Sequence, residues 1–125
     1  MPGALSCDRR VLVADDNTDA ADSLAMLLEL SGYDVRVAHN GRAALALAQT
    51  FRPHTAVLDI DMPDISGYEV ARELRRGKGG AEMRLIALTG RGQDSDRLRA
   101  NKAGFNHHIT KPGDPTALEA LLRDH

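Results

Sequence analysis

Short apolar runs alternate with longer amphipathic stretches along this chain. A run such as "VLVA" (11–14) is typical of a buried strand, whereas "TDAADSLAMLLELSG" (18–32) carries its apolar residues at helical spacing. The pattern predicts strands at 11–14, 34–38, 55–59, 84–89 and 106–110. It predicts helices at 18–31, from Gly41 to just before Pro53, at 67–76, at about 94–103 and at 115–125.

Strict alternation of strands and helices predicts an α/β sandwich built on a parallel sheet. Because crossover connections are right-handed, few topologies remain. We expect a flavodoxin-like (βα)5 fold, with strand order 2-1-3-4-5 and helices on both faces of the sheet. The topological switch point then lies between strands 1 and 3, and ligands bind beyond the carboxyl ends of the strands.

Length, charge and cysteine content limit the classes of protein to which this chain can belong. The chain has 125 residues, which suits one domain, and we expect a flexible segment at 1–9 followed by the domain at 10–125. The net charge of −2 gives no general reason to expect nucleic-acid or membrane partners. The single cysteine, Cys7, excludes a disulfide framework. The sequence contains neither a secretory signal nor an apolar run of membrane-spanning length, so the expected location is the cytoplasm.

Polar residues recur where the predicted strands end. Asp15 and Asp16 follow the first strand, Asp59 ends the third, Thr89 ends the fourth and Lys111 follows the fifth. Strands 1 and 3 are neighbours in the expected order, so the three aspartates should converge. Two carboxylates about 4 Å apart repel by roughly 4 kcal/mol at an effective dielectric near 20. A proton or a cation must therefore offset their charge.

The donor types favour Mg²⁺, which prefers hard oxygen ligands and stays partly hydrated. A hydroxyl and an ammonium nearby suit a phosphoryl group. Each residue also has a simpler interpretation: Asp15 or Asp16 as a helix cap, Thr89 as a turn residue, Lys111 as a solvated lysine. These interpretations are commoner one by one, but together they leave the recurrence at four strand ends unexplained.

Two further groups of polar residues are interpreted more simply. Asp64 is taken as a solvated acid in the loop after the third strand. His107 and His108 are adjacent on a strand, so their side chains point to opposite faces. We therefore expect packing or partner contact from them rather than a shared metal.

Four motifs carry a family resemblance, in this order: "VLVADDN", "VLDIDMPDISG", "ALTG" and "ITKP". From Arg10 to about Arg123 the chain resembles the receiver domain of response regulators in two-component signalling. The resemblance implies a phosphorylation-activated switch that catalyses only its own phosphorylation and slow dephosphorylation, and that is otherwise not an enzyme. Its phosphodonor would be a sensor histidine kinase or a histidine phosphotransfer protein, and its output a downstream protein partner.

The resemblance also implies roles for single residues. Asp59 is the phosphoacceptor. Asp16 binds Mg²⁺ directly, Asp15 binds it mainly through water, and Asp61 offers its backbone carbonyl. Thr89 and Lys111 contact the phosphoryl oxygens. The bond before Pro112 is expected to be cis, as in the family.

Several positions differ from the commonest family pattern. His108 stands where the family often has Tyr or Phe, and Gly113 where a larger apolar residue is common. Asp61 and Arg91 occupy positions that in the family tune hydrolysis of the phosphoryl group. The stretch "GFNHHITKPGDP" is most similar to receivers attached to hybrid sensor kinases.

Two other functions are weighed against this one. A haloacid-dehalogenase-like phosphatase would use Asp59 and Asp61 with Mg²⁺, but its Asp-x-Asp motif follows the first strand, whereas here it follows the third. A flavodoxin-like cofactor binder is disfavoured because acids at the switch point would repel a flavin phosphate. Steady turnover of phosphate esters and bound flavin colour, respectively, would identify these two alternatives.

Overall fold

The computed structural model describes residues 10–62, 64–77, 80–89, 96–110 and 115–123. Its strands are β1 (Arg10–Ala14), β2 (Asp34–Ala38), β3 (Thr55–Asp59), β4 (Arg84–Thr89) and β5 (His107–Thr110). Its helices are α2 (Thr18–Leu30), α3 (Gly41–Phe51), α4 (Gly67–Arg76), α5 (Asp96–Ala103) and α6 (Pro115–Arg123), with a 3₁₀ turn, η1, at Gly80–Glu82. Strands and helices alternate along the chain as the apolar pattern predicts.

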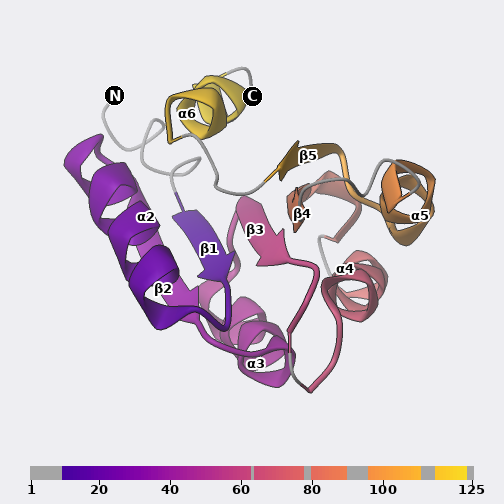
Figure 1. Cartoon of the computed structure of the whole chain (residues 1–125). Coiled ribbons are helices and arrows are strands. Elements are labelled where there is room, and N and C mark those ends of the chain that lie inside the picture. The colour runs from indigo at the N-terminus through magenta and orange to yellow at the C-terminus, as the bar shows by residue number, and fades with distance from the viewer. Residues whose placement is uncertain (1–9, 63, 78–79, 90–95, 111–114, 124–125) are drawn as a thin grey trace.

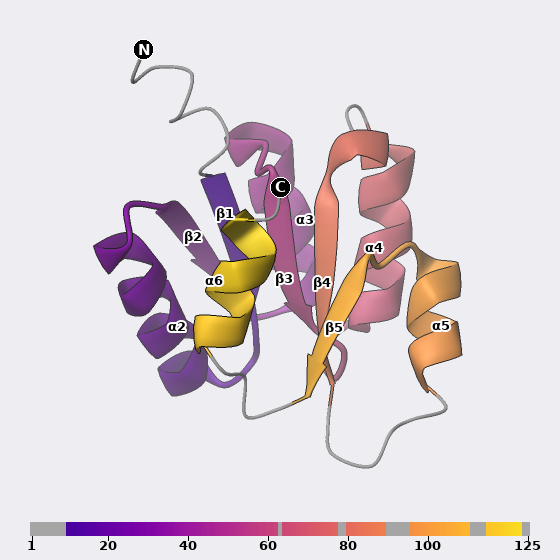
Figure 2. The ribbon, with the colours of Figure 1, turned by 90° about the horizontal axis from the view of Figure 1, so that it is seen from above.

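The five strands form one parallel sheet in the order β2-β1-β3-β4-β5. Figures 1 and 2 show α3, α4 and α5 on one face of this sheet and α2 and α6 on the other. The expected flavodoxin-like architecture is therefore confirmed. The chain reverses direction across the sheet between β1 and β3, which makes this pair of strands the switch point.

Two aliphatic cores result from the alternation of side chains along each strand. Leu12 and Ala14 of β1 face the core beneath α3, α4 and α5, whereas Val11 and Val13 face the core beneath α2 and α6. Because both faces are covered, β1 and β3 are apolar and buried along almost their whole length. The charged residues therefore collect where these strands end.

Asparagine and serine side chains start the first three helices. The side chain of Asn17 accepts a hydrogen bond from the backbone N–H of Ala20, and Asn40 and Ser66 do the same for α3 and α4. The cap of α2 is thus Asn17, and neither Asp15 nor Asp16 takes that position. Among the described residues, no helix is long and apolar enough to cross a membrane.

Candidate functional site

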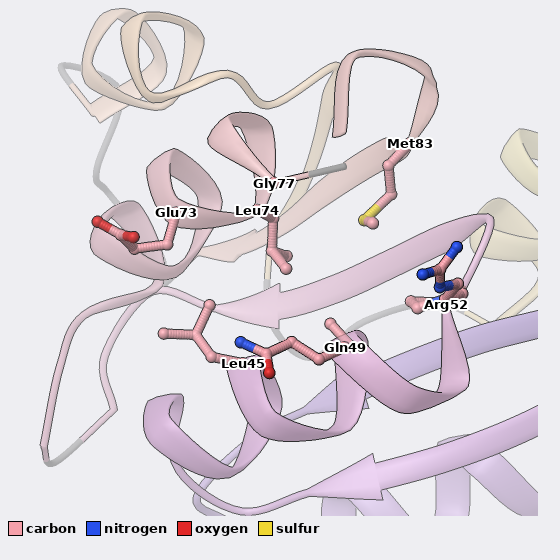
Figure 3. Close-up of a pocket in the computed structure, with 9 residues that line it drawn as sticks. Leu45, Gln49, Arg52, Glu73, Leu74, Gly77 and Met83 are labelled. Carbon is pink, nitrogen blue, oxygen red and sulfur yellow. The ribbon is translucent and has the colours of Figure 1, made fainter. Parts of the chain in front are cut away.

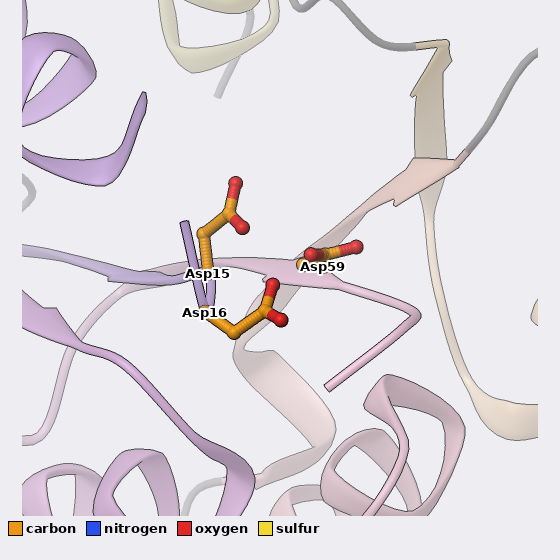
Figure 4. Close-up of side chains that lie close together, drawn as sticks. All are labelled: Asp15, Asp16 and Asp59. Atoms are coloured by element: carbon orange, nitrogen blue, oxygen red, sulfur yellow. The ribbon is translucent and has the colours of Figure 1, made fainter. Parts of the chain in front are cut away.

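Three carboxylates meet at the carboxyl ends of β1 and β3, as Figure 4 shows. One oxygen from each of Asp15, Asp16 and Asp59 can be chosen so that all three lie within 4.8 Å of one another. The sheet register explains the meeting, because Ala14 pairs with Leu58 and the next residues are Asp15 and Asp59. The predicted convergence of the three aspartates is therefore confirmed.

Burial makes this cluster costly. Asp15 and Asp59 are only 2% and 3% exposed to solvent, whereas Asp16 is exposed. Like charges at this separation repel strongly once water is removed from around them. Since the exposed Asp16 leaves the cluster open to solvent on one side, a cation has a path to it.

The cluster fits Mg²⁺ by donor type and by size. All three donors are carboxylate oxygens, the hard ligands that Mg²⁺ prefers. Metal–oxygen bonds of about 2.1 Å hold ligand atoms about 3 to 4 Å apart. Oxygens that already lie within 4.8 Å of one another need only a small adjustment to reach such spacings.

Backbone hydrogen bonds hold Asp59 and the loop that follows it. The N–H of Ile60 donates to the carbonyl of Leu88 on β4, at 3.1 Å. The N–H of Asp61 donates to Oδ1 of Asp59, also at 3.1 Å. The N–H of Gly67 donates to the carbonyl of Ile60 at 2.9 Å and closes the loop. The bond from Asp61 orients the Asp59 carboxylate, and the other two bonds hold the loop in place.

Thr89 lies at the same edge of the sheet. It ends β4 and is 6% exposed. Asp59 pairs with Leu88, so Thr89 is one residue beyond Asp59 on the neighbouring strand. The side chain of Asp61 is exposed, which suits a role through its backbone carbonyl alone. The roles of Thr89 and Asp61 remain predictions.

Other predicted residues lie outside the described part of the chain, namely Arg91, Lys111, Pro112 and Gly113. His107 and His108 are both half-buried on β5, opposite Ile86 and Ala87 of β4. Of the described residues, the group that geometry offers to a metal is the aspartate cluster, and it contains neither histidine.

The exposure expected for Asp64 is confirmed, but this residue is more than a solvated loop acid. The residue is exposed, but its Oδ1 accepts hydrogen bonds from the N–H groups of Gly41 at 2.8 Å and Ile65 at 2.7 Å, and its Oδ2 accepts one from Arg42 at 3.0 Å. Desolvation would raise the pKa of Asp64, but these hydrogen bonds outweigh it and hold the pKa below its usual value. One signal existed in the sequence: the first turn of α3 contains no acidic residue of its own.

A separate cavity of about 560 Å³ lies between α3 and α4 (Figure 3). Leu45, Ala48, Leu74 and Met83 form its apolar part, and Arg52 lies at its border. Arg52 and Met83 precede β3 and β4, so this cavity lies toward the amino ends of the strands. The aspartate cluster lies at the opposite edge of the sheet, and the cavity takes no part in it.

Comparison with known proteins gives the family. A family model described as "Response regulator receiver domain" matches residues 11–123. Response regulator MprA of Mycolicibacterium vanbaalenii is 40% identical over 113 residues, which cover 90% of this chain and 47% of that protein. RpaA of Synechocystis, named as a DNA-binding dual master transcriptional regulator, is 33% identical over 91% of this chain and 47% of its own length. The chain thus spans about half the length of these two regulators.

A third relative is close to this chain in length. The uncharacterized 14.6 kDa protein in the sodA1 3' region of Leptolyngbya boryana is 37% identical over 115 residues, which cover 92% of this chain and 88% of that protein.

Solved structures agree with the sequence comparison. A CheY-like receiver domain from Methanospirillum hungatei superposes with a TM-score of 0.85 at 29% identity, covering 93% of this chain and 91% of that one. The receiver domain of sensor histidine kinase PA1611 from Pseudomonas aeruginosa superposes with a TM-score of 0.84 at 28% identity, covering 93% and 95%. That structure has a magnesium ion coordinated in its active-site cleft. The chain therefore belongs to the receiver-domain family of two-component response regulators.

Proposed function

We propose that Asp59 accepts a phosphoryl group from the phosphohistidine of a sensor histidine kinase or a histidine phosphotransfer protein. The observation that carries the proposal is the burial of Asp59 at a strand end beside two other carboxylates. A buried aspartate in such a place is costly for the fold, and a phosphoacceptor role with a bound cation accounts for it. The phosphorylated domain then signals through a downstream protein partner.

In the proposed reaction an oxygen of the Asp59 carboxylate attacks phosphorus. The bond between phosphorus and the donor's imidazole nitrogen breaks, and the imidazole keeps the electron pair. The product is an acyl phosphate on Asp59. The hydrogen bond from the N–H of Asp61 to Oδ1 of Asp59 supports this role, because it orients the nucleophile in advance.

Asp15, Asp16 and Asp59 would hold Mg²⁺ together with the backbone carbonyl of Asp61, with Asp15 acting mainly through water. When bound, the ion supplies positive charge that offsets both the carboxylates and the phosphoryl oxygens. The magnesium ion in the PA1611 receiver domain supports this assignment.

Thr89 and Lys111 complete the proposed site. The hydroxyl of Thr89, buried at the end of β4, would donate to a phosphoryl oxygen. The ammonium of Lys111 would offset charge on the group during transfer. Beyond this reaction and slow loss of the phosphoryl group, we propose no other catalysis, and steady hydrolysis of phosphate esters is not expected.

Exposed apolar residues on α2 support a protein partner. Met26, Leu27 and Leu30 are 62%, 42% and 80% exposed on this helix. These residues lie in the second half of α2, whose first residue, Thr18, is two residues after Asp16. A protein that covers the whole helix would therefore reach from this apolar surface to the aspartate cluster. We infer that the receiver domain occupies residues 10–125 and expect no nucleic-acid contact from it. A receiver within a hybrid kinase and a separate regulator both fit this account.

Intact-mass measurement tests the proposal. Incubation with acetyl phosphate and Mg²⁺ should add one phosphoryl mass to the wild-type chain, and EDTA should suppress the addition. Asp59→Asn should abolish it, whereas Asp19→Asn, which changes an exposed acid on α2, should not. A normal adduct on Asp59→Asn would contradict the assignment. Steady release of phosphate from an ester such as p-nitrophenyl phosphate would favour the phosphatase instead.

A further inference from the structure

We propose that Asp64 is a positioning residue for the phosphoacceptor site, because its carboxylate ties the loop between β3 and α4 to the start of α3. The inference rests on the proposed role of Asp59. Within the described part of the chain, Asp64 accepts hydrogen bonds from Gly41, Arg42 and Ile65, and it shares none with Asp59 or the other cluster acids. It acts through the loop, which also carries Asp61.

The carboxylate of Asp64 completes the capping of α3. The side chain of Asp64 accepts hydrogen bonds from the N–H groups of Gly41 and Arg42. The side chain of Asn40 accepts one from the N–H of Ala43. The first N–H groups of a helix have no partners within the helix, so two residues far apart in sequence share the capping of α3. A carboxylate at this end is also favoured by the helix dipole. The contact therefore joins the loop to a rigid element.

The loop also fits closely around that contact. A Cβ atom on Gly41 would lie 2.4 Å from Cγ1 and 2.8 Å from the carbonyl oxygen of Ile65. A Cβ atom on Gly67 would lie 2.5 Å from the carbonyl oxygen of Asp59. Two glycines thus allow the loop to pack directly against α3 and against the end of β3, which leaves little room for the loop to shift.

The same loop connects Asp64 to the carboxylate of Asp59. Asp61 precedes Asp64 by three residues in the same loop, and its N–H donates to Oδ1 of Asp59. Its carbonyl is the proposed backbone ligand of the metal. If the bonds between Asp64 and α3 are lost, packing at Gly41 and Gly67 is left to hold the loop against α3 and the end of β3, and Asp61 should move more readily beside Asp59. Asp64 therefore sets the geometry of a site that it does not touch.

A simpler role would be to stabilise α3 alone, and Asn40 offers a matched control. Asn40→Ala removes the other cap of the same helix but leaves the loop bound through Asp64. Asp64→Ala removes one cap of α3 and also the hydrogen bonds that hold the loop to this helix. Asp64→Asn keeps an oxygen that can accept the same N–H groups, so it should retain part of the function.

The test compares wild type, Asp64→Ala, Asp64→Asn and Asn40→Ala by amide NMR. Hydrogen exchange at Asp61 should speed up in Asp64→Ala and stay unchanged in Asn40→Ala, although both variants melt earlier than wild type. A Mg²⁺ titration followed through the same amides should show affinity weakened about 10-fold in Asp64→Ala, as for other residues that orient metal ligands. The affinity of Asp64→Asn should lie between those of wild type and Asp64→Ala.

Unchanged exchange at Asp61 and unchanged Mg²⁺ affinity in Asp64→Ala would overturn the proposal, as would equal effects in Asn40→Ala. If Asp64→Ala does not fold, Asp64→Asn decides by the same two readouts. Neither readout needs a phosphodonor. A wild-type chain that forms no adduct with acetyl phosphate would thus contradict the proposed function. The hydrogen-exchange comparison would still test whether Asp64 holds Asp61 in place.

Discussion

Asp59 and Asp64 are five residues apart and have opposite surroundings. Asp59 is buried beside two other carboxylates, whereas Asp64 is exposed and surrounded by backbone N–H groups. Crowding among like charges disfavours the negative charge of Asp59, whereas backbone hydrogen bonds favour that of Asp64. An acid that is buried among like charges is therefore the better candidate for chemistry. An exposed acid whose carboxylate caps a helix is the better candidate for a role in architecture.

The same substitution should therefore change stability in opposite directions at the two positions. Asp59→Asn removes one of three crowded charges, and we expect the free energy of unfolding in EDTA to rise by about 2 kcal/mol. Chemical denaturation measures this value. As a control, Asp61→Asn changes an exposed acid two residues away and should stay within about 0.5 kcal/mol of wild type. A lower free energy of unfolding in Asp59→Asn than in wild type would contradict the claim that crowding disfavours the charge of Asp59.

Lys111→Ala tests whether this lysine interacts with the phosphoryl group on Asp59. The lysine should matter most when that group is present, so folding should stay largely intact in the variant. Beryllofluoride, a mimic of aspartyl phosphate, should raise the melting temperature of wild type through linkage and raise that of Lys111→Ala much less. An equal gain in both proteins would show that Lys111 plays no part.

Asp64→Asn should lower stability at neutral pH, which is the reverse of the result expected at Asp59. Because the pKa of Asp64 is lower in the folded state, the carboxylate stabilises the fold above the unfolded pKa of about 4. This contribution is lost as the pH falls through the folded pKa. The difference in free energy of unfolding between wild type and Asp64→Asn should thus be largest at pH 7 and should disappear in strong acid. A difference that grows as the pH falls would contradict a stabilising role for the Asp64 carboxylate.

The smallest expected effect concerns His108, which is half-buried on β5. Burying an imidazole ring gains less apolar contact than burying Tyr or Phe at the same place, so we expect the ring to stay partly exposed after activation. A soluble paramagnetic agent should broaden the ring resonances of His108 equally with and without beryllofluoride. Strong protection on adding the mimic would mean that the ring moves inward.

The strand ends explain why much of this site was predictable from sequence. Apolar runs end abruptly at Ala14 and Leu58, and parallel strands bring such ends to one edge of a sheet. Periodicity and topology together are therefore enough to place Asp15 beside Asp59. Local signals in the sequence were enough to place the start of α3 after Asn40.

Contacts that depend on loop geometry were not predictable in this way. Asp64 reaches a helix start 23 residues earlier, and no periodic pattern records that distance. Arg75 likewise donates to the carbonyls of Gly80, Met83 and Gly104, although it belongs to an ordinary helix. β5 begins one residue later than predicted, and the side chain of Asn106, just before it, accepts a hydrogen bond from the N–H of Leu85. These are side-chain-to-backbone bonds, whose partners are fixed only once the fold exists.

Chemical identification of the modified residue tests the central claim most directly. After incubation with acetyl phosphate and Mg²⁺, borohydride reduces an aspartyl phosphate to homoserine, which peptide mass spectrometry can place in the sequence. We predict homoserine at position 59, with aspartate intact at positions 15, 16, 61 and 64. Homoserine at any of those four positions, with position 59 unchanged, would contradict the account.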